Sequence, residues 1–369
     1  MLEFGGPINS RLKASPNIPF ISARAVHSTR HAVTRIFKFS TLFVEMTAMR
    51  QVLHKLMRRV LRKLQREWIS FYARIRARMR DRNVMVTFVH HNTSMVFNLG
   101  DFLCSPRHYF SFEAVRPVCV IGGGAFNDLA TAEARRVKGR TRVSWAIGRT
   151  LGFRDAASPP DRAAVFSLFA VASTRDLQEV GETICFVPCV SVLHPLVETK
   201  PGTAVGLFLS ADDQGASLSS KSILEHQSRV RPDLVLGTNA MSEETFIGAF
   251  AKTNEVVTNS YHVAYWSLLS GRSVAVLGYS TKFTSLLEAF GLPSEAVYRY
   301  SRGDGEGLAR LVEKALDERR FVSLPDYRSV RQEFRAVNLR FAERLVSEGI
   351  FTAVIPRFRD LDKPAEQAA

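Results

Sequence analysis

The sequence lacks the long apolar runs of a membrane-spanning protein. No stretch reaches the roughly 18 consecutive apolar residues that a spanning helix needs. No apolar signal segment followed by a small-residue cleavage site is present either. These absences predict a cytoplasmic protein without a spanning helix.

Cysteine is also scarce, since the chain has 4 cysteines in 369 residues. No two of them form a CxxC pair, which argues against a disulfide framework and against a zinc site. Three of the four lie inside apolar runs that read as strands. We therefore expect no metal site, and we expect buried free thiols of a reducing compartment at Cys104, Cys119, Cys185 and Cys189.

Most of the chain has no excess charge of either sign, although the net charge of the whole chain is +15. Residues 1–83 hold 18 Lys and Arg against 4 Asp and Glu, whereas the remaining residues hold 32 against 31. A nearly neutral body argues against a nucleic-acid channel. The basic charge therefore belongs to the N-terminal segment alone.

This N-terminal segment has two parts. Residues 1–45 are poor in acids and without clear periodicity, so we expect them to be disordered, as a transit peptide or as sequence upstream of the true start. Met46 and Met49 are the candidate starts. In residues 46–82 apolar side chains recur mostly at three- and four-residue steps, which predicts one long basic amphipathic helix.

The basic helix has two interpretations that the pattern does not separate. Its Lys and Arg suit anionic lipid headgroups and Trp68 suits the lipid boundary, which would place the protein peripherally at the inner face of the membrane. The alternative is a helix that packs its apolar stripe on the protein's own body. An RNA-binding arm is a poorer third interpretation.

From Asn83 onward, short apolar runs alternate with helical patterns. The length allows two domains of about 150 residues each, and the 46% apolar content is that of a globular protein. Buried strands separated by helices predict an α/β fold with parallel sheets. The predicted strands are NVMVTFV, PVCVIGGG, RVSWAIG, AVFSLFAVAS, ICFVPCV, AVGLFLS, DLVLGT, EVVTN and SVAVLGY.

The segment ETKPGT, residues 198–203, has the composition of a linker between two such units. We therefore place an N-terminal domain at 83–200, a C-terminal domain at 201–350 and a tail at 351–369. A helix that returns to the first domain is expected over residues 326–349, DYRSVRQEFRAVNLRFAERLVSEG.

Functional groups in such sheets lie where strands end and helices begin, because helix N-termini aim backbone N–H groups at anions. The junctions of the first unit are NLGD (98–101), GGGAFND (122–128) and STRD (173–176). Those of the second are TNSYH (258–262) and GYSTK (278–282). The three consecutive glycines do not form the GxGxxG pattern of a nicotinamide-dependent dehydrogenase, and a tight turn explains them equally well.

A histidine and a lysine stand at the starts of two successive predicted helices. Alone, His262 is more often a packed residue than a catalyst, and Lys282 is more often solvated. Together they predict a pocket for a small anion with a proton donor at hand, lined by the hydroxyls of Ser260, Tyr279, Ser280 and Thr281.

In this order the motifs resemble the polysaccharide pyruvyl transferase family. The resemblance covers residues 83–295 and rests on NLGD, VCVIGGG, STRD and VVTNSYHVAYWSLLSGRSVAVLGYSTKFTSLLEAFGLP. It implies a GT-B-like fold, in which two Rossmann-like domains face each other across a cleft. It also implies transfer of the enolpyruvyl group of phosphoenolpyruvate to a sugar of an exopolysaccharide or of its lipid-linked precursor. The product is a pyruvate ketal, and phosphate is released.

The resemblance also implies roles for the motif residues. His262 and Asp101 are the expected catalytic residues. No cofactor is implied besides the co-substrate phosphoenolpyruvate, and no nucleic acid. The donor would bind to Lys282, Asn259, Ser260, Tyr279 and Ser280, and the glycan acceptor to Asn98, Gly100, Gly123 and Gly124.

The residue types suit this chemistry. Phosphoenolpyruvate carries a carboxylate and a phosphate, which Lys282 and two helix starts can bind. A histidinium at position 262 can protonate C3 of the enol near neutral pH, and Asp101 can accept the proton of the attacking sugar hydroxyl.

Two features depart from the family pattern. Many relatives carry an arginine two residues before the histidine, where this chain has Ser260, so the missing cation must come from elsewhere. The candidates are Arg149, Arg154 and Arg175. The segment VHHNTSMVF before Asn98 also lacks the glycines often found there, which leaves the acceptor sugar open.

Two rival functions fit the same architecture. A nucleotide-sugar glycosyltransferase of GT-B type would need a carboxylate for the ribose, and Glu288 is its candidate. A non-catalytic sugar-binding or scaffold protein would not need the acid, base and cation that Asp101, His262 and Lys282 supply together.

Overall fold

The computed structural model describes residues 84–89, 97–123, 125–126, 137, 139–149, 151–153, 165–212, 216 and 218–357. All of them belong to one compact unit, Ala73–Ala369. The predicted segments 1–45 and 46–82 lie outside the described residues. So do Gly124, Arg154 and the side chain of Arg149.

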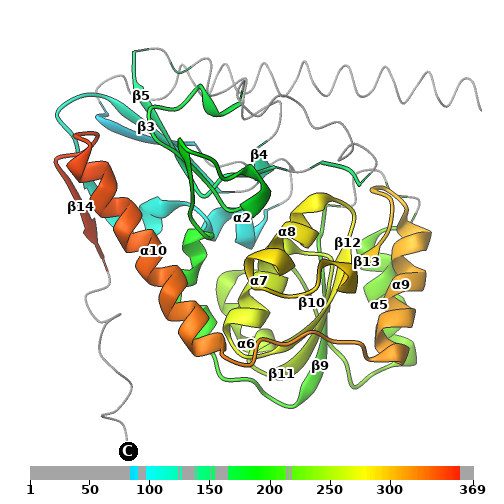
Figure 1. The fold of residues 1–369 in the computed structure, drawn as a ribbon. Coiled ribbons are helices and arrows are strands. Elements are labelled where there is room, and N and C mark those ends of the chain that lie inside the picture. Colours follow the sequence, from blue (N-terminus) through cyan, green and yellow to red (C-terminus); the bar gives the residue numbers. More distant parts are fainter. Residues whose placement is uncertain are drawn as a thin grey trace, which may run out of the picture. The chain divides into compact units, whose positions relative to one another are not determined.

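The fold is α/β with parallel sheets, as the sequence predicts (Figure 1). The larger sheet has five strands in the order β10-β9-β11-β12-β13, and every neighbouring pair is parallel. Parallel strands covered on both faces are apolar nearly throughout, and AVGLFL and SVAVLG show this pattern. The strands are β9 (Ala204–Leu209), β10 (Val235–Thr238), β11 (Thr253–Thr258), β12 (Ser273–Gly278) and β13 (Tyr298–Arg299).

Helices cover both faces of this sheet (Figure 1). One face packs on α5 (Ser220–Val230) and α9 (Gly305–Glu318), and the other on α6 (Glu243–Phe250), α7 (Tyr261–Leu269) and α8 (Thr281–Ala289). Every residue of α7 is buried. A helix that is buried all round lies inside the fold, so polar side chains on α7 need an explanation.

The smaller sheet has the order β1-β3-β5 and is also parallel. Isolated bridges from Val143 to Val171 and from Ile147 to Thr174 join it to a further parallel pair, β7 with β8. A short pair, β4 with β6, follows the glycine-rich junction. The bounds are β1 (Val86–Val89), β3 (Val118–Gly122), β4 (Ala125–Phe126), β5 (Thr141–Trp145), β6 (Gly148–Arg149), β7 (Ala172–Thr174) and β8 (Ile184–Phe186).

One strand prediction is wrong over half its length. In the segment AVFSLFAVAS, residues 164–173, only the last two residues belong to β7. Residues 165–166 are helical, and residues 167–168 form a turn. A short apolar run has the same composition in a buried turn as in a strand, so periodicity does not distinguish them.

The helix predicted over 326–349 is confirmed as α10 (Tyr327–Ser347). Its Asn338 accepts a hydrogen bond from Trp145 Nε1 at 2.9 Å and donates to the carbonyl of Pro188 at 3.2 Å, so it packs on residues of the smaller sheet and its connections. Figure 1 shows α10 running on to β14 (Ala353–Pro356), which pairs antiparallel with β2 (Phe110–Glu113). Part of the predicted tail 351–369 therefore belongs to the fold.

The predicted linker is held by one buried arginine. The Arg272 side chain, which is 0% exposed, donates to the carbonyls of Thr199 and Lys200 within that linker. It also donates to the carbonyls of Thr253 and Phe250. These bonds fix the linker against the start of β11. The boundary between two domains at this linker stays a prediction.

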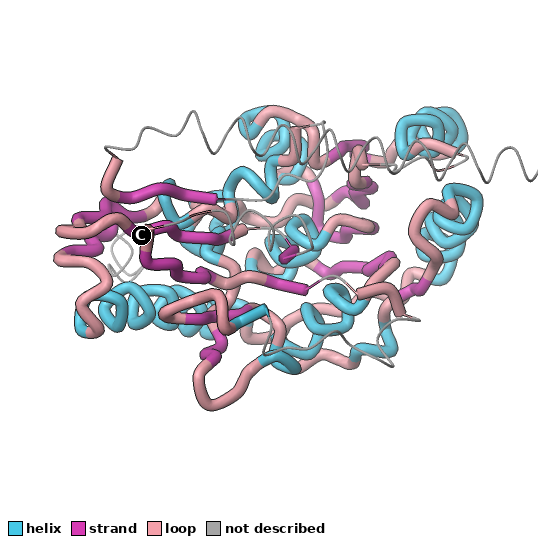
Figure 2. Tube along the Cα trace, turned by 90° about the horizontal axis from the view of Figure 1, so that it is seen from above, coloured by secondary structure: helices cyan, strands magenta, loops and turns pink. Residues whose placement is uncertain are grey.

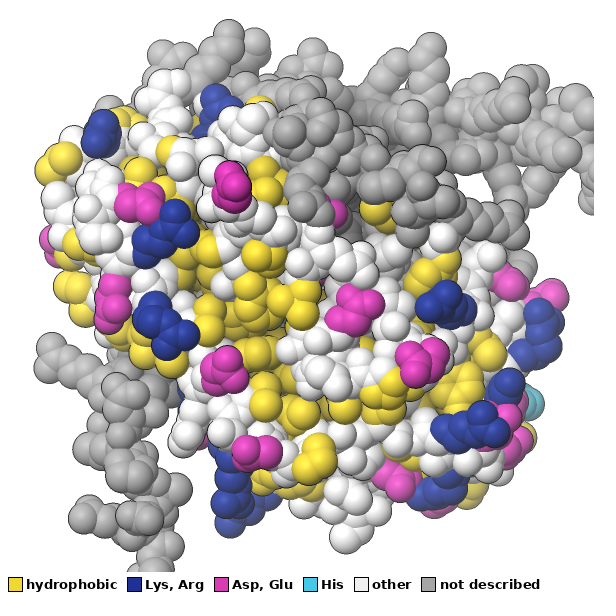
Figure 3. Space-filling view, in the orientation of Figure 1, with side chains coloured by type: hydrophobic (Ala, Val, Ile, Leu, Met, Phe, Trp, Pro, Cys, Tyr) yellow, Lys and Arg dark blue, Asp and Glu magenta, His cyan; other side chains and the backbone are white. Residues whose placement is uncertain are grey.

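The surface of the described residues carries charges of both signs. On the face drawn in Figure 3, the Lys and Arg side chains are interspersed with Asp and Glu. Figure 2 shows the same strands and helices from above. No helix among the described residues has the length and apolar character needed to span a bilayer.

Candidate active site

The predicted histidine and lysine both stand in the first turn of a helix. His262 is the second residue of α7, directly after β11, and Lys282 is the second residue of α8, directly after β12. The two strands are parallel neighbours in the sheet, so both helices start at the same edge. These placements confirm the strand-to-helix junctions that the sequence predicts.

Asp101 lies on the short helix α2 (Leu99–Leu103), and its position is fixed by Asn98. The Asn98 side chain caps this helix by accepting from the backbone N–H groups of Gly100 and Asp101, and its amide donates to Asp101 Oδ2 at 3.0 Å. The backbone N–H of Leu99 donates to the carbonyl of Asn239 at 2.8 Å, which ties α2 to the loop after β10. The sequence predicted Asn98 as an acceptor-binding residue. In the structure its side chain orients Asp101.

The side chains of His262 and Asp101 lie close together because a glycine allows their two helices to pack closely. The Nδ1 atom of His262 lies 4.0 Å from Oδ1 of Asp101. A methyl group at Gly100 would overlap the imidazole ring, so no larger residue fits at this position without displacing His262. Gly100 therefore belongs to the site through close packing.

Three basic side chains act on the Asp101 carboxyl. Burial raises the pKa of Asp101 above its ordinary value of 3.8, whereas the nearby His262, Lys282 and Arg175 lower it. The side chain is 14% exposed. Since burial is the larger influence, the site holds a carboxylate that is more basic than a solvated one.

Arg175 is one of the three arginines that the sequence offered as a source of the missing cation. It follows β7, is 3% exposed, and holds its guanidinium 3.9 Å from the ring centre of Tyr261, the first residue of α7. Gly148 leaves room for it, because a methyl group there would lie 2.5 Å from Nε. Its Nε and Nη1 atoms are buried and have no hydrogen-bond partner in the described part of the chain.

Lys282 is held by the tyrosine three residues before it. Its Nζ donates to the Tyr279 hydroxyl at 2.7 Å and lies 4.6 Å from the centre of the same ring. Ser260 and Ser280 are the buried N-cap residues of α7 and α8, and neither side chain caps its helix. Within the described residues the buried Ser280 Oγ has no hydrogen-bond partner.

Asn259 occupies the switch point of the larger sheet, where the strand order reverses between β9 and β11. Its Oδ1 accepts from the backbone N–H of Ser210 at 2.7 Å, and its Nδ2 donates to the Tyr300 hydroxyl at 3.1 Å. Asn259, Tyr279 and Arg302 line a small pocket of about 30 Å³ at this edge. The Asn259 side chain thus fixes the shape of the crevice.

The remaining predicted glycine, Gly123, faces a cysteine. It has φ +78°, and a methyl group on it would lie 2.5 Å from the Cys104 sulfur. None of the four cysteines forms a disulfide, and Cys185 alone of them is only partly buried. Sequence reasoning missed that Cys104 and Cys189 lie beside Asp101 and His262. The two cysteines are far apart in the chain and share no local motif, so no sequence signal could have paired them.

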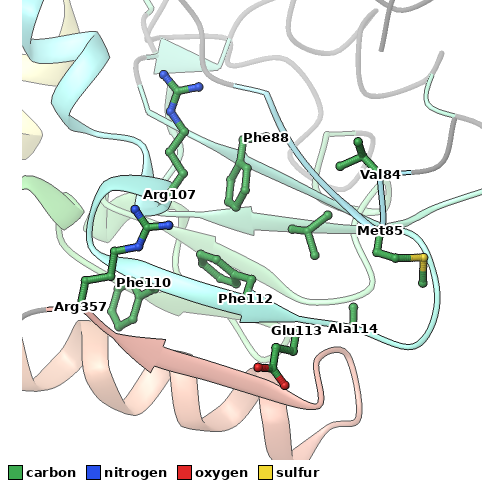
Figure 4. Close-up of a pocket in the computed structure, with 10 residues that line it drawn as sticks. Val84, Met85, Phe88, Arg107, Phe110, Phe112, Glu113, Ala114 and Arg357 are labelled. Atoms are coloured by element: carbon green, nitrogen blue, oxygen red, sulfur yellow. The ribbon is translucent and has the colours of Figure 1, made fainter. Parts of the chain in front are cut away.

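A larger pocket of about 500 Å³ lies elsewhere. Figure 4 shows Phe88, Phe110 and Phe112 lining it, with the arginines 107 and 357 at one side. None of the predicted site residues lines this pocket. Glu288, the candidate ribose ligand, accepts a hydrogen bond from Gln178 Nε2 at 2.9 Å.

The raised pKa of Asp101 gives a testable stability effect. Because burial disfavours the ionised carboxylate in the folded state, Asp101→Asn should raise the free energy of unfolding at neutral pH. The gain should shrink as the pH falls through the raised pKa towards 3.8, since the wild-type side chain then also becomes neutral. Urea unfolding over this pH range measures it, with the exposed Asp233→Asn as control. A gain that is absent at neutral pH, or equal at every pH, would contradict the assignment.

No model of a known protein family matches the chain, and no curated protein sequence matches it at a significant level. The function of the site must therefore be inferred from its own residues and geometry.

Proposed function

We propose that the protein is a pyruvyl transferase. It moves the enolpyruvyl group of phosphoenolpyruvate onto a sugar of a polysaccharide or its lipid-linked precursor, forms a pyruvate ketal and releases phosphate. The observation that carries the proposal is that His262 Nδ1 lies 4.0 Å from Oδ1 of the partly buried Asp101, whose pKa Lys282 and Arg175 also influence. A proton donor, two permanent cations and a basic carboxylate are the groups this reaction requires.

The proposed architecture is GT-B-like. The smaller sheet and its connections form the acceptor-side domain, 83–200, and the larger sheet forms the donor-side domain, 201–350. Asp101 and Arg175 come from the first, and His262 and Lys282 from the second. The hydrogen bond from Leu99 to Asn239 is one of the contacts that support this arrangement.

An excess of positive charge favours a donor with more than one negative group. Lys282 has a neutral hydroxyl as its hydrogen-bond partner, and Arg175 keeps two buried N–H groups unpartnered among the described residues. A buried N–H without a partner is costly, so a ligand oxygen there is expected. We assign the phosphate and carboxylate of phosphoenolpyruvate to Lys282 and Arg175, with Arg175 replacing the arginine absent at Ser260. Ser280 and Tyr279 complete this donor side.

The reaction uses both sides of the site. His262 donates a proton to C3 of the enol, and a sugar hydroxyl attacks C2 while Asp101 accepts its proton. The C2–O bond to phosphate then breaks, and a second hydroxyl closes the ketal. Of the two hydroxyl protons, one restores the histidinium and the other leaves with the phosphate. The enzyme ends unchanged.

The acceptor is assigned to the side of α2. Asn98 holds the Asp101 carboxylate in place on this side, and Gly100 lets α2 pack closely against His262. A lipid-linked acceptor would also suit a peripheral membrane contact of the basic segment 46–82, which lies outside the described residues.

Transfer of labelled carbon tests the proposed function. Carbon-labelled phosphoenolpyruvate should pass its label to a glycan in step with phosphate release. Label transfer from a nucleotide sugar instead would show a glycosyltransferase.

A further inference from the structure

Two cysteines in the site have no part in the proposed reaction. Cys104 and Cys189 are 2% and 1% exposed, and each interacts with the other and with Asp101. Cys189 also interacts with His262. One ligand atom from each of Asp101, Cys104 and His262 lies within 4.8 Å of the other two. These three ligand atoms therefore surround one point, and Cys189 lies beside them.

The fold brings the three ligands and the neighbouring Cys189 together without a local motif. Asp101 and Cys104 are three residues apart on and just after α2, so both point to the same side of it. His262 comes from α7, and Cys189 precedes the short helix η4 (Val190–Leu193). Gly123 leaves space for the Cys104 sulfur, because it has no side chain to meet that atom.

The donor set selects a class of metal ion. A thiolate, an imidazole nitrogen and a carboxylate oxygen are ligands of Zn²⁺ and similar thiophilic cations, whereas Mg²⁺ and Ca²⁺ prefer oxygen ligands alone. Ligand atoms around tetrahedral zinc are about 3.3–3.8 Å apart, which follows from zinc–ligand bonds of about 2.0–2.3 Å. The separations of up to 4.8 Å therefore require a closing movement of about 1 Å.

A second observation points to a ligand. The Nε2 atom of His262 is buried and forms no hydrogen bond of normal geometry within the described residues. The ring is 4% exposed, so water does not replace the missing partner freely. A metal ion bound to Nε2 would provide the missing partner.

We propose that Asp101, Cys104 and His262 form a binding site for a thiophilic divalent cation such as Zn²⁺, and that the bound ion inhibits the enzyme. The Cys104 thiol releases its proton to the solvent on binding, and no group is oxidised or reduced. Inhibition follows because the ion occupies the proposed acid and base. The inhibition rests on the proposed function, whereas the binding does not.

Cobalt binding tests the site directly. Under anaerobic conditions the full chain is titrated with Co²⁺, whose thiolate charge-transfer absorption reports cysteine ligands. We expect one equivalent bound with this absorption in wild type and in Cys185→Ser, because Cys185 contacts the Ala172 carbonyl away from the cluster. Cys104→Ser should weaken the affinity at least about tenfold and reduce the absorption. Wild type without thiolate absorption, or equal binding by both variants, would overturn the proposal.

Zinc inhibition is measured separately. Cys104→Ser should keep the basal release of phosphate from phosphoenolpyruvate but require at least about tenfold more Zn²⁺ for inhibition. Unchanged turnover in wild type with Zn²⁺ bound would overturn the inhibitory role. Absence of turnover in metal-free wild type would instead contradict the proposed function, and the cobalt absorption would still show the metal site.

Discussion

Replacement of His262 by alanine is expected to lower kcat by about 10² to 10⁴-fold, the usual cost of removing a general acid. Its affinity for phosphoenolpyruvate should change little, because proton transfer to C3 matters only in the transition state. The measurement is phosphate release at saturating phosphoenolpyruvate with a glycan acceptor, together with the Kd of the donor from calorimetry.

Two further variants separate chemistry from packing. His262 is buried, so His262→Gln, which better fills the same space, should show a similar loss of kcat while its thermal unfolding stays close to that of wild type. His226→Ala is the matched control, since that side chain is 58% exposed on α5. Near-normal turnover of His262→Gln would end the role of His262 as the acid and leave it a structural residue.

Replacement of Lys282 by alanine is expected to act on the donor instead. A charge-assisted hydrogen bond contributes about 1.5–3 kcal/mol, so the Kd for phosphoenolpyruvate should rise about 10- to 100-fold. The kcat at saturating donor should fall much less, because charge pairing acts in the ground state and the transition state alike. The effect is measured as the protection that phosphoenolpyruvate gives against thermal unfolding, because this protection depends on the Kd.

The control for this variant is Lys221→Ala, whose side chain is 85% exposed on α5. It should bind phosphoenolpyruvate as wild type does. A Lys282→Ala protein with unchanged donor affinity and a large loss of kcat would place Lys282 in the chemical step. If nucleotide sugars protect wild type but not Lys282→Ala, and phosphoenolpyruvate protects neither, the rival glycosyltransferase would be supported.

The sequence predicted the parts of this fold that local pattern determines. Strands β11 and β12 each contain a buried apolar run, and each is followed directly by a helix whose second residue is titratable or charged. Local pattern alone therefore placed His262 and Lys282 at the sheet edge. The α10 helix was also predictable, because its apolar residues recur at helical spacing.

What the sequence could not predict depends on contacts between distant segments. Three arginines were equal candidates for the missing cation, and local sequence gave no sign that Arg175 packs on Tyr261. From the sequence, strand β14 was assigned to a tail, because its pairing with the distant strand β2 leaves no local signal. The roles of Gly100 and Gly123 are likewise set by the side chains opposite them, His262 and Cys104.

The cysteines illustrate the same limit. Their spacing correctly predicted that none of them forms a disulfide. It gave no indication that Cys104 and Cys189 would lie against the same histidine, since the residues that bring them together belong to three separate elements. A metal site assembled in this way has no motif, so the spacing that argued against zinc could not test it.

The measurement that tests the central claim most directly is transfer of carbon from phosphoenolpyruvate to a glycan. Purified wild-type protein, kept free of metal by a chelator, is incubated with carbon-labelled phosphoenolpyruvate and glycans extracted from the cells that make it. His262→Gln serves as the inactive control. The proposed function predicts that label enters a glycan as an acid-labile ketal, with one phosphate released for each label transferred. Labelling of the same glycans from a nucleotide sugar, with none from phosphoenolpyruvate, would contradict it.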